Sequence, residues 1–279
     1  GMFKSKDVGK FWETASTGLS ALNVGRLAVD PWNPDVVYAA PAYINIPSGI
    51  QKTSDGAKTW TAKNKGLDPL TAMWIELDRS NPATAYTIVW GGGIYRTYNG
   101  GDDWEKASDG LPGLNGYCVV HGEADPKVWL AGLDGSGLYR LDEGADRWVE
   151  SKKGLTASSI WHLAQDPNDG NAWLAGAPEA GLFKSTDGAK SWRKVTKGLM
   201  VSDIYRVVYH PKKPGVVYLG SKSAAGNGPG GGVFRSTDGG ESWAPDNAGL
   251  PSLNVQDLAV TSTGLIYVGT DSGLFYKQD

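Results

Sequence analysis

The feature that most constrains the fold is a set of markers that occurs six times along the chain. Each copy has a Gly, a Trp eleven residues later, and a Gly-Leu pair six residues after the Trp. The six tryptophans are Trp12, Trp60, Trp104, Trp148, Trp192 and Trp243, at intervals of 48, 44, 44, 44 and 51 residues. A unit of this length cannot bury its own apolar faces, so we expect residues 1–279 to form one domain of stacked copies.

Each copy has the pattern of four short β-strands. In the fifth copy we expect strands over residues 204–209, 215–220, 232–236 and 242–245. The second strand of each copy is apolar almost throughout, which is typical of a strand covered on both faces. First strands should begin near Val24, Ala72, Gly116, Ile160, Ile204 and Val255. Four-stranded antiparallel units that repeat radially form a β-propeller, so we predict an all-β, six-bladed β-propeller.

The two ends of the chain carry the same piece of the repeat. Gly1–Asp7 (GMFKSKD) and Gly273–Asp279 (GLFYKQD) are both copies of the third strand and its turn. We therefore expect a ring closed by pairing the N-terminal and C-terminal strands. The last blade would then run from Val255 onward and be completed by the fourth strand near Trp12. The sequence leaves open which terminal copy takes the place of the third strand.

The turn before each Trp has the form Ser/Thr-x-Asp-x-Gly-x-x-Trp, here called the Ser/Thr-x-Asp turn. The fifth copy shows it with Ser236, Asp238, Gly240 and Trp243. Copies that begin at Ser5, Thr53 and Ser185 follow it closely, whereas the copy before Trp104 has Asn99 and the copy before Trp148 has Leu141 and Glu143. A short carboxylate in such a turn accepts backbone N–H groups, and the Trp fills the space between sheets, so we interpret these residues as structural.

These turns resemble the Asp-box, or BNR, repeat of sialidases, of the sortilin propeller and of xyloglucan-cleaving glycoside hydrolases. The resemblance covers essentially the whole chain. It implies a propeller in which the Asp is structural, and a secreted or periplasmic location, although no signal peptide is present in this sequence. It does not imply sialidase activity, because the Arg-Ile-Pro motif of sialidases is absent and only Arg26 and Arg206 fall at suitable positions.

Composition excludes several other functions. A net charge of -3 and a pI near 5.7 give no electrostatic reason to expect nucleic acid as a partner. No apolar run is long enough to insert into a membrane. The single cysteine, Cys118, rules out an intrachain disulfide and is best interpreted as a small buried apolar residue. The three histidines lack metal-ligand spacing, and we expect no metal and no cofactor. Oligomeric state is left open.

Eleven residues after each Trp, every copy has a small polar residue. These are Asn23, Thr71, Asn115, Ser159, Asp203 and Asn254. We expect them to bond their own backbone in a turn before the first strand begins.

Three residues further on, the copies differ from one another. The equivalent residues are Arg26, Trp74, Cys118, His162, Arg206 and Asp257. One interpretation is structural: an Arg26–Asp257 pair that neutralises itself in the channel, a hydrogen-bonded His and a core Trp. The other is an anion- or sugar-binding mouth, in which arginines supply forked donors and Trp74, Trp161 or Tyr205 supply a stacking face.

Two connections between second and third strands are longer than their equivalents, over residues 41–48 and 221–231. Long loops on a rigid scaffold often carry binding residues. Tyr43, Asn45, Lys222 and Asn227 are the candidates there.

The sequence leaves two functions open. The first is a non-catalytic propeller that recognises a glycan or a peptide at the mouth of its channel. The second is a glycoside hydrolase or lyase acting on an extracellular polysaccharide, with Asp257 and Asp203 as candidate catalytic carboxylates. Ordinary glycoside hydrolysis needs two carboxylates that flank the scissile bond. Glu76, on an inner strand, either has a raised pKa or pairs with an arginine.

Overall fold

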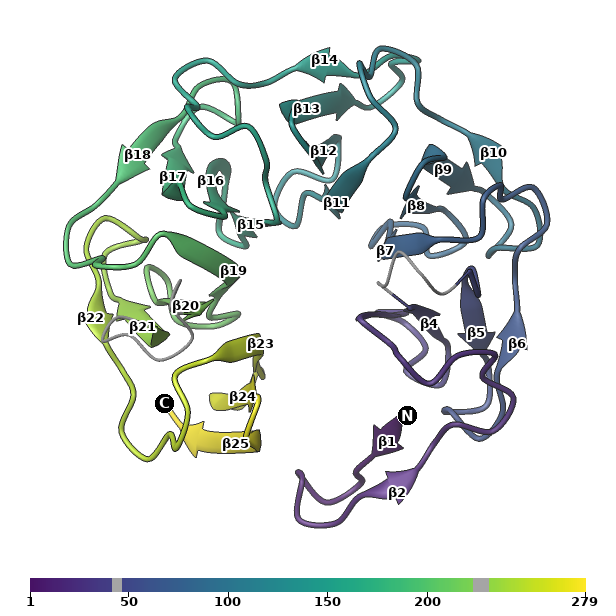
Figure 1. Cartoon of the computed structure of the whole chain (residues 1–279), viewed down its shortest axis with the longest axis horizontal. Coiled ribbons are helices and arrows are strands. Elements are labelled where there is room, and N and C mark those ends of the chain that lie inside the picture. Colours follow the sequence, from purple (N-terminus) through teal and green to yellow (C-terminus); the bar gives the residue numbers. More distant parts are fainter. Residues whose placement is uncertain (42–46, 223–230) are drawn as a thin grey trace. The chain divides into compact units, whose positions relative to one another are not determined.

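The computed structural model describes residues 1–41, 47–222 and 231–279 and is all-β (Figure 1). No α-helix occurs among these residues. The described part of the chain accordingly contains no helix with the length and apolarity needed to cross a bilayer.

Most of the chain forms four-stranded sheets whose strands follow one another in sequence order, as in the blades of a propeller (Figure 1). The first sheet contains β3 (Arg26–Val29), β4 (Val37–Ala40), β5 (Gln51–Thr53) and β6 (Thr61–Ala62). The second contains β7 (Ala72–Leu77), β8 (Ala85–Val89), β9 (Gly93–Thr97) and β10 (Glu105–Lys106). The next sheet contains β11 (Gly116–His121), β12 (Val128–Leu133), β13 (Gly137–Asp142) and β14 (Val149–Glu150).

The remaining strands repeat this order. One further four-stranded sheet contains β15 (His162–Asp166), β16 (Asp169–Ala177), β17 (Gly181–Ser185) and β18 (Arg193–Val195). Another contains β19 (Asp203–Tyr209), β20 (Val217–Lys222), β21 (Gly232–Ser236) and β22 (Ala244–Pro245). A three-stranded sheet contains β23 (Val255–Val260), β24 (Leu265–Thr270) and β25 (Gly273–Gln278), and β1 (Phe3–Lys4) pairs with β2 (Glu13–Thr14). The all-β propeller fold and its six first strands, β3, β7, β11, β15, β19 and β23, are confirmed.

The chain divides into two compact units. The first contains residues 1–121 and 141–149, and the second contains residues 122–140 and 150–279. Each has a core between its own sheets. In the first unit Ile50, Ile75 and Trp104 belong to one buried cluster, and in the second Leu174, Leu219 and Trp243 belong to another. Second strands such as β8 and β12 are buried along their whole length, as their apolar sequences predict.

The repeated Gly-Leu and Trp markers meet at the junctions between consecutive sheets. The backbone N–H of Trp60 donates to the carbonyl of Thr17 at 2.9 Å, and a Cβ on Gly18 would lie 2.3 Å from the Trp60 carbonyl oxygen. Four later junctions repeat both contacts, at Gly66 with Trp104, Gly110 with Trp148, Gly154 with Trp192 and Gly198 with Trp243. Each Gly therefore lets the fourth strand of one sheet approach the Trp backbone of the next.

The Ser/Thr-x-Asp turns are closed by hydrogen bonds of the Asp itself. The Ser185 hydroxyl donates to Asp187 Oδ1 at 2.8 Å, and the Lys190 and Ser191 N–H groups donate to the same oxygen at 3.0 and 2.9 Å. Burial raises the pKa of Asp187, but hydrogen bonds from Ser191 and Ser185 outweigh that effect and lower the pKa to about 2. The Asp is thus a structural acceptor, as its position in the turn predicts.

At the two ends of the chain, β1 pairs with β2, with Phe3 opposite Thr14, and β25 pairs with β24. Each terminal copy of the third strand is thus paired with a strand from its own end of the chain. The predicted pairing between the N-terminal and C-terminal strands would join the two units, and it stays a prediction.

Candidate functional site

The residues that differ between copies lie on the first strands. In three sheets a shift in the pairing register of the first strand comes directly before them. The register shifts between Ala72 and Trp74 in β7, between Ile204 and Arg206 in β19, and between Val255 and Asp257 in β23. A β-bulge re-aims the side chains next to it and is common beside functional sites. The first strands therefore have an altered geometry at the positions where the sequence stops repeating.

In the first unit, Arg26 of β3 lies between two side chains of β7. Its guanidinium is 3.9 Å from the centroid of the Trp74 ring, and its Nη2 is 3.0 Å from Glu76 Oε2. The ion pair is largely buried, with 17% and 11% of the two side chains exposed. Arg26 and Trp74 are brought together as predicted, and Glu76 pairs with an arginine, the second of the two roles that its position allowed.

In the second unit, Arg206 of β19 links side chains from the strands on either side. Its Nε is 2.8 Å from Asp257 Oδ1 on β23, and its Nη1 is 2.7 Å from His162 Nε2 on β15. Since a guanidinium can only donate, Nε2 of His162 is the acceptor and the imidazole is neutral in this contact. His162 is buried, whereas 62% of the Asp257 side chain is exposed.

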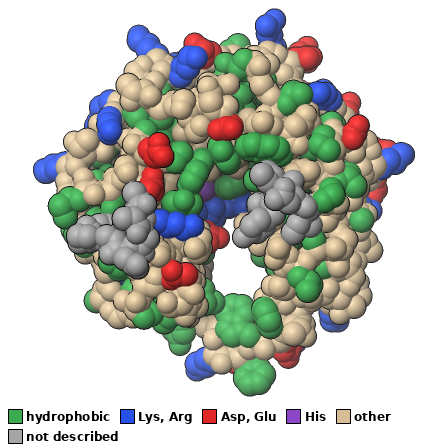
Figure 2. All heavy atoms as spheres, viewed as in Figure 1, with side chains coloured by type: hydrophobic (Ala, Val, Ile, Leu, Met, Phe, Trp, Pro, Cys, Tyr) green, Lys and Arg blue, Asp and Glu red, His purple; other side chains and the backbone are tan. Residues whose placement is uncertain are grey.

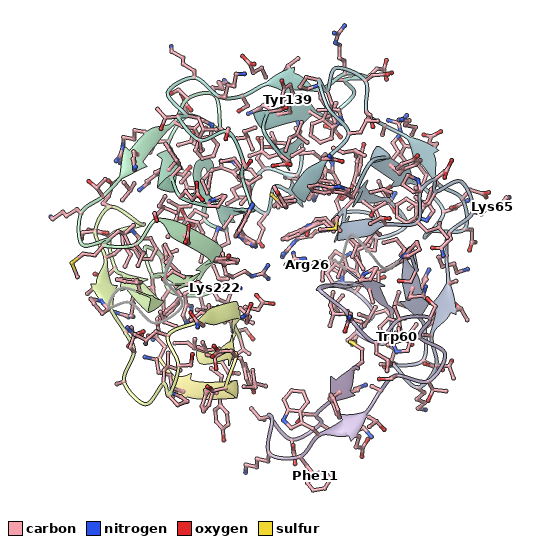
Figure 3. All side chains as sticks on the ribbon, viewed as in Figure 1. Phe11, Arg26, Trp60, Lys65, Tyr139 and Lys222 are labelled. Atoms are coloured by element: carbon pink, nitrogen blue, oxygen red, sulfur yellow. The ribbon has the colours of Figure 1, made fainter. Side chains whose placement is uncertain are left out.

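A second group of side chains in this unit surrounds Tyr205, at the bulge of β19. The Trp161 ring meets the Tyr205 ring edge-on, with centroids 4.5 Å apart and planes inclined at 65°. Lys222 lies at the end of β20 (Figure 3). Its ammonium lies 4.2 Å from the Tyr205 ring centroid. Burial lowers the pKa of Lys222, while the charge of Asp271 partly offsets that effect. This cation is partly desolvated and has no carboxylate within ion-pair distance among the described residues.

The Arg–Asp pair of the structural interpretation is formed by Arg206 and Asp257, while Arg26 pairs with Glu76. Each arginine reaches the carboxylate of a neighbouring first strand within its own unit. Cys118 is fully buried, as predicted. Tyr43, Asn45 and Asn227 lie outside the described residues.

The small polar residues before the first strands also act differently from the prediction. Asn115 Oδ1 accepts the Gly91 N–H at 2.8 Å, and Asp203 Oδ1 accepts the Glu179 N–H at 2.8 Å. Both partners lie in the turn between second and third strands of the preceding sheet. These residues fasten one sheet to the next, because a turn in that sheet presents an N–H that its own strands cannot satisfy. Asp203 is therefore held as a structural acceptor.

The carboxylates at these positions are engaged with cations or backbone. Glu76 and Asp257 are each bound to an arginine, and Asp203 to a backbone N–H. The arrangement is suited to holding a ligand through Lys222, Arg206 and the aromatic pair. Sequence reasoning named each of these side chains, but missed the bulges and the contact of Lys222 with Tyr205, which depend on a local break in strand pairing.

No protein-family model and no curated protein matches the chain. Solved structures do. The chain is similar over 97% of its length to "YCF48 bound to D1 peptide", where it covers 83% of that chain at 18% identity with a TM-score of 0.70. It is similar over 99% of its length to YCF48 from Cyanidioschyzon merolae, covering 88% of that chain at 18% identity with a TM-score of 0.68.

A third similar structure is an ancestral GH74 enzyme, matched over 94% of this chain at 14% identity with a TM-score of 0.71. This chain spans only 38% of that enzyme. Identities in this range show the shared propeller fold and do not transfer an activity.

Proposed function

We propose that this protein is a non-catalytic propeller that binds a peptide segment bearing a carboxylate, through the side chains around Tyr205 in the second unit. The observation that carries the proposal is Lys222. Its ammonium is partly buried against an aromatic ring and lacks a carboxylate partner among the described residues. A desolvated cation is stabilised by an anion that replaces the lost water.

The same geometry favours a peptide over a glycan. A sugar ring would stack on a free aromatic face, but Lys222 lies over the face of Tyr205, and Trp161 packs against Tyr205 in a T-shaped contact. Arg206 is already held by Asp257 and His162, so it is oriented before a ligand arrives. The similar propeller YCF48, which was solved bound to the D1 peptide, supports this ligand class by analogy with the fold.

No contact of this kind supports glycoside hydrolysis, because both candidate catalytic carboxylates, Asp257 and Asp203, are engaged in structural contacts.

We also infer that the repeats are Asp-box repeats. The Ser/Thr Oγ to Asp Oδ1 hydrogen bond recurs at 2.7 to 2.8 Å in the turns of Asp7, Asp55, Asp187 and Asp238.

The test is a titration of fluorescent acidic peptides, including free C-terminal carboxylates, followed by anisotropy. We expect Lys222→Ala to weaken binding about tenfold or more, because a charge-assisted hydrogen bond is worth roughly 1.5 to 3 kcal/mol. Lys212→Ala is the matched control, since Lys212 is exposed in a turn outside the site. Binding that is equal in wild type and Lys222→Ala, or binding of neutral glycans alone, would overturn the proposal.

A further inference from the structure

The turn between β16 and β17, in the second unit, contains a residue with a strained backbone, Glu179. Its φ of +58° lies in the left-handed region, where every residue except glycine is strained. The Ala180 N–H donates to the Pro178 carbonyl at 2.6 Å, which makes a tight three-residue turn around Glu179. Strain that a fold retains at one position is a reason to look for a function of that residue.

Two equivalent turns have glycine at this position. Gly91 and Gly135 also have positive φ, of +79° and +66°. A Cβ on Gly135 would meet no described atom within 4 Å, and one on Gly91 would meet only Pro69 Cγ at 3.9 Å. The surroundings of these two turns therefore leave room for a side chain, and glycine relieves the backbone there. The turn of Glu179 keeps a glutamate in the same conformation.

Glu179 is held close to the side chains around Tyr205. Asp203 Oδ1 accepts the Glu179 N–H at 2.8 Å, and Asp203 lies directly opposite Lys222 in the β19–β20 pairing. Cα atoms of opposed residues in antiparallel strands are about 5 Å apart, so the Cα atoms of Glu179 and Lys222 are at most about 13 Å apart. An extended peptide covers that distance with about four residues.

The two ends of this short span carry opposite charges. The Lys222 ammonium is partly desolvated against the Tyr205 ring. Glu179 is exposed, and its carboxylate has no cation within ion-pair distance among the described residues. Figure 2 shows acidic (red), hydrophobic (green) and basic (blue) side chains exposed close together over the β15–β18 and β19–β22 sheets. A purely acidic ligand would be attracted at Lys222 and repelled at Glu179, so this pair favours a ligand that carries both charges.

We propose that Glu179 determines which peptides bind beside Tyr205, and that the bound peptide has a basic side chain within about four residues of its carboxylate. This rests on the proposed peptide-binding function, in which Lys222 binds the carboxylate of the peptide. Glu179 accepts hydrogen bonds from the ammonium or guanidinium group of that basic side chain. Complementary charges give specificity more than affinity, which is a role for a glutamate at a position where glycine would be unstrained.

Three fluorescein-labelled peptides of equal length test the proposal by anisotropy. Each contains a single glutamate. The first has a lysine three positions before the glutamate, the second has a lysine three positions after it, and the third has alanine at both positions. Exposed ion pairs are weak and are screened by salt. We therefore expect wild type to bind one lysine peptide about two- to fivefold more tightly than the alanine peptide at low salt, and the difference to shrink at high salt.

Two variants of Glu179 separate its charge from its backbone. Glu179→Gln removes the charge, so it should abolish the preference for lysine while the alanine peptide binds at least as tightly as before. Glu179→Gly should abolish the preference too and leave Tm close to that of wild type, because relief of strain offsets the greater flexibility of glycine in the unfolded chain. Glu143→Gln is the matched control that should keep the preference, since Glu143 is exposed in a turn of the first unit.

The outcomes distinguish this inference from the proposed function. Equal binding of all three peptides by wild type overturns the inference, and so does a preference for lysine that survives in Glu179→Gln. A Glu179→Gly variant that is clearly less stable than wild type also overturns it, because the side chain would then serve the fold. Weaker binding of the alanine peptide to Lys222→Ala supports the proposed function in each of these cases. If wild type binds none of the peptides, the function and the inference both fall.

Discussion

Two glycines with similar backbone conformations differ in what they face, and this pair tests how the sheets are joined. Gly198 has φ +78° and Gly144, in an exposed turn, has φ +76°. Placing Ala at either position forces an L-residue into the left-handed region, at a cost of about 1 kcal/mol. At Gly198 the new Cβ would also lie 1.9 Å from the Trp243 carbonyl oxygen, whereas at Gly144 it meets no described atom within 4 Å.

That clash cannot be relieved by a side-chain rotation, because the opposing atom belongs to the backbone. Overpacking of this kind costs about 1 to 3 kcal/mol more. We therefore expect Gly198→Ala to lower the free energy of unfolding by about 2 to 4 kcal/mol and Gly144→Ala by about 1 kcal/mol. Urea titrations followed by tryptophan fluorescence measure both. Equal costs would refute the reasoning, because the contact between Gly198 and the Trp243 backbone would then cost the Ala variant nothing extra.

Three further sets of variants test the remaining contacts. Glu76→Gln should destabilise the protein by about 2 to 4 kcal/mol, because it leaves the largely buried Arg26 without its carboxylate partner. The double variant Arg26→Met/Glu76→Met should cost less, since it leaves no buried charge unpaired. Chemical denaturation measures both, and a double variant as unstable as Glu76→Gln would contradict this account. Asp187, whose pKa is lowered to about 2, contributes stability that is fully present above pH 5 and is lost as the pH falls toward 2, so Asp187→Asn should flatten the decline of Tm over that range. Trp148→Ala should cost about 3 to 5 kcal/mol because Trp148 is 2% exposed, whereas Trp32→Ala, at a residue that is 75% exposed, should cost about 1 kcal/mol or less. The same urea titration measures both, and equal values would contradict the assignment of Trp148 to the core.

The repeat markers predicted the fold because each marks a contact that every junction needs. The Trp spacing located all six first strands, and the Ser/Thr-x-Asp pattern predicted an Asp held by its own turn. The sequence left open whether Gly1–Asp7 or Gly273–Asp279 takes the third-strand position of the last blade, because the two copies are alike. In the structure β25 is the third strand of that sheet.

The candidate site was predicted less completely. The break in the repeat pointed to Arg26, Trp74, His162, Arg206 and Asp257, but not to their partners. Pairing depends on the reach of a side chain across to the neighbouring strand, as Arg26 on β3 reaches Glu76 on β7. The small polar residues before the first strands were predicted to bond their own backbone. In the structure Asn115 and Asp203 instead accept hydrogen bonds from a turn of the preceding sheet.

The most direct test of the central claim is hydrogen–deuterium exchange with and without a bound acidic peptide. The claim is that residues at which the copies differ form the binding site, while the repeated residues hold the fold. We expect the peptide to slow exchange over residues 203–206 and at Lys222, with little change in the Ser/Thr-x-Asp turns. Protection confined to those turns, with none around Tyr205, would contradict the account.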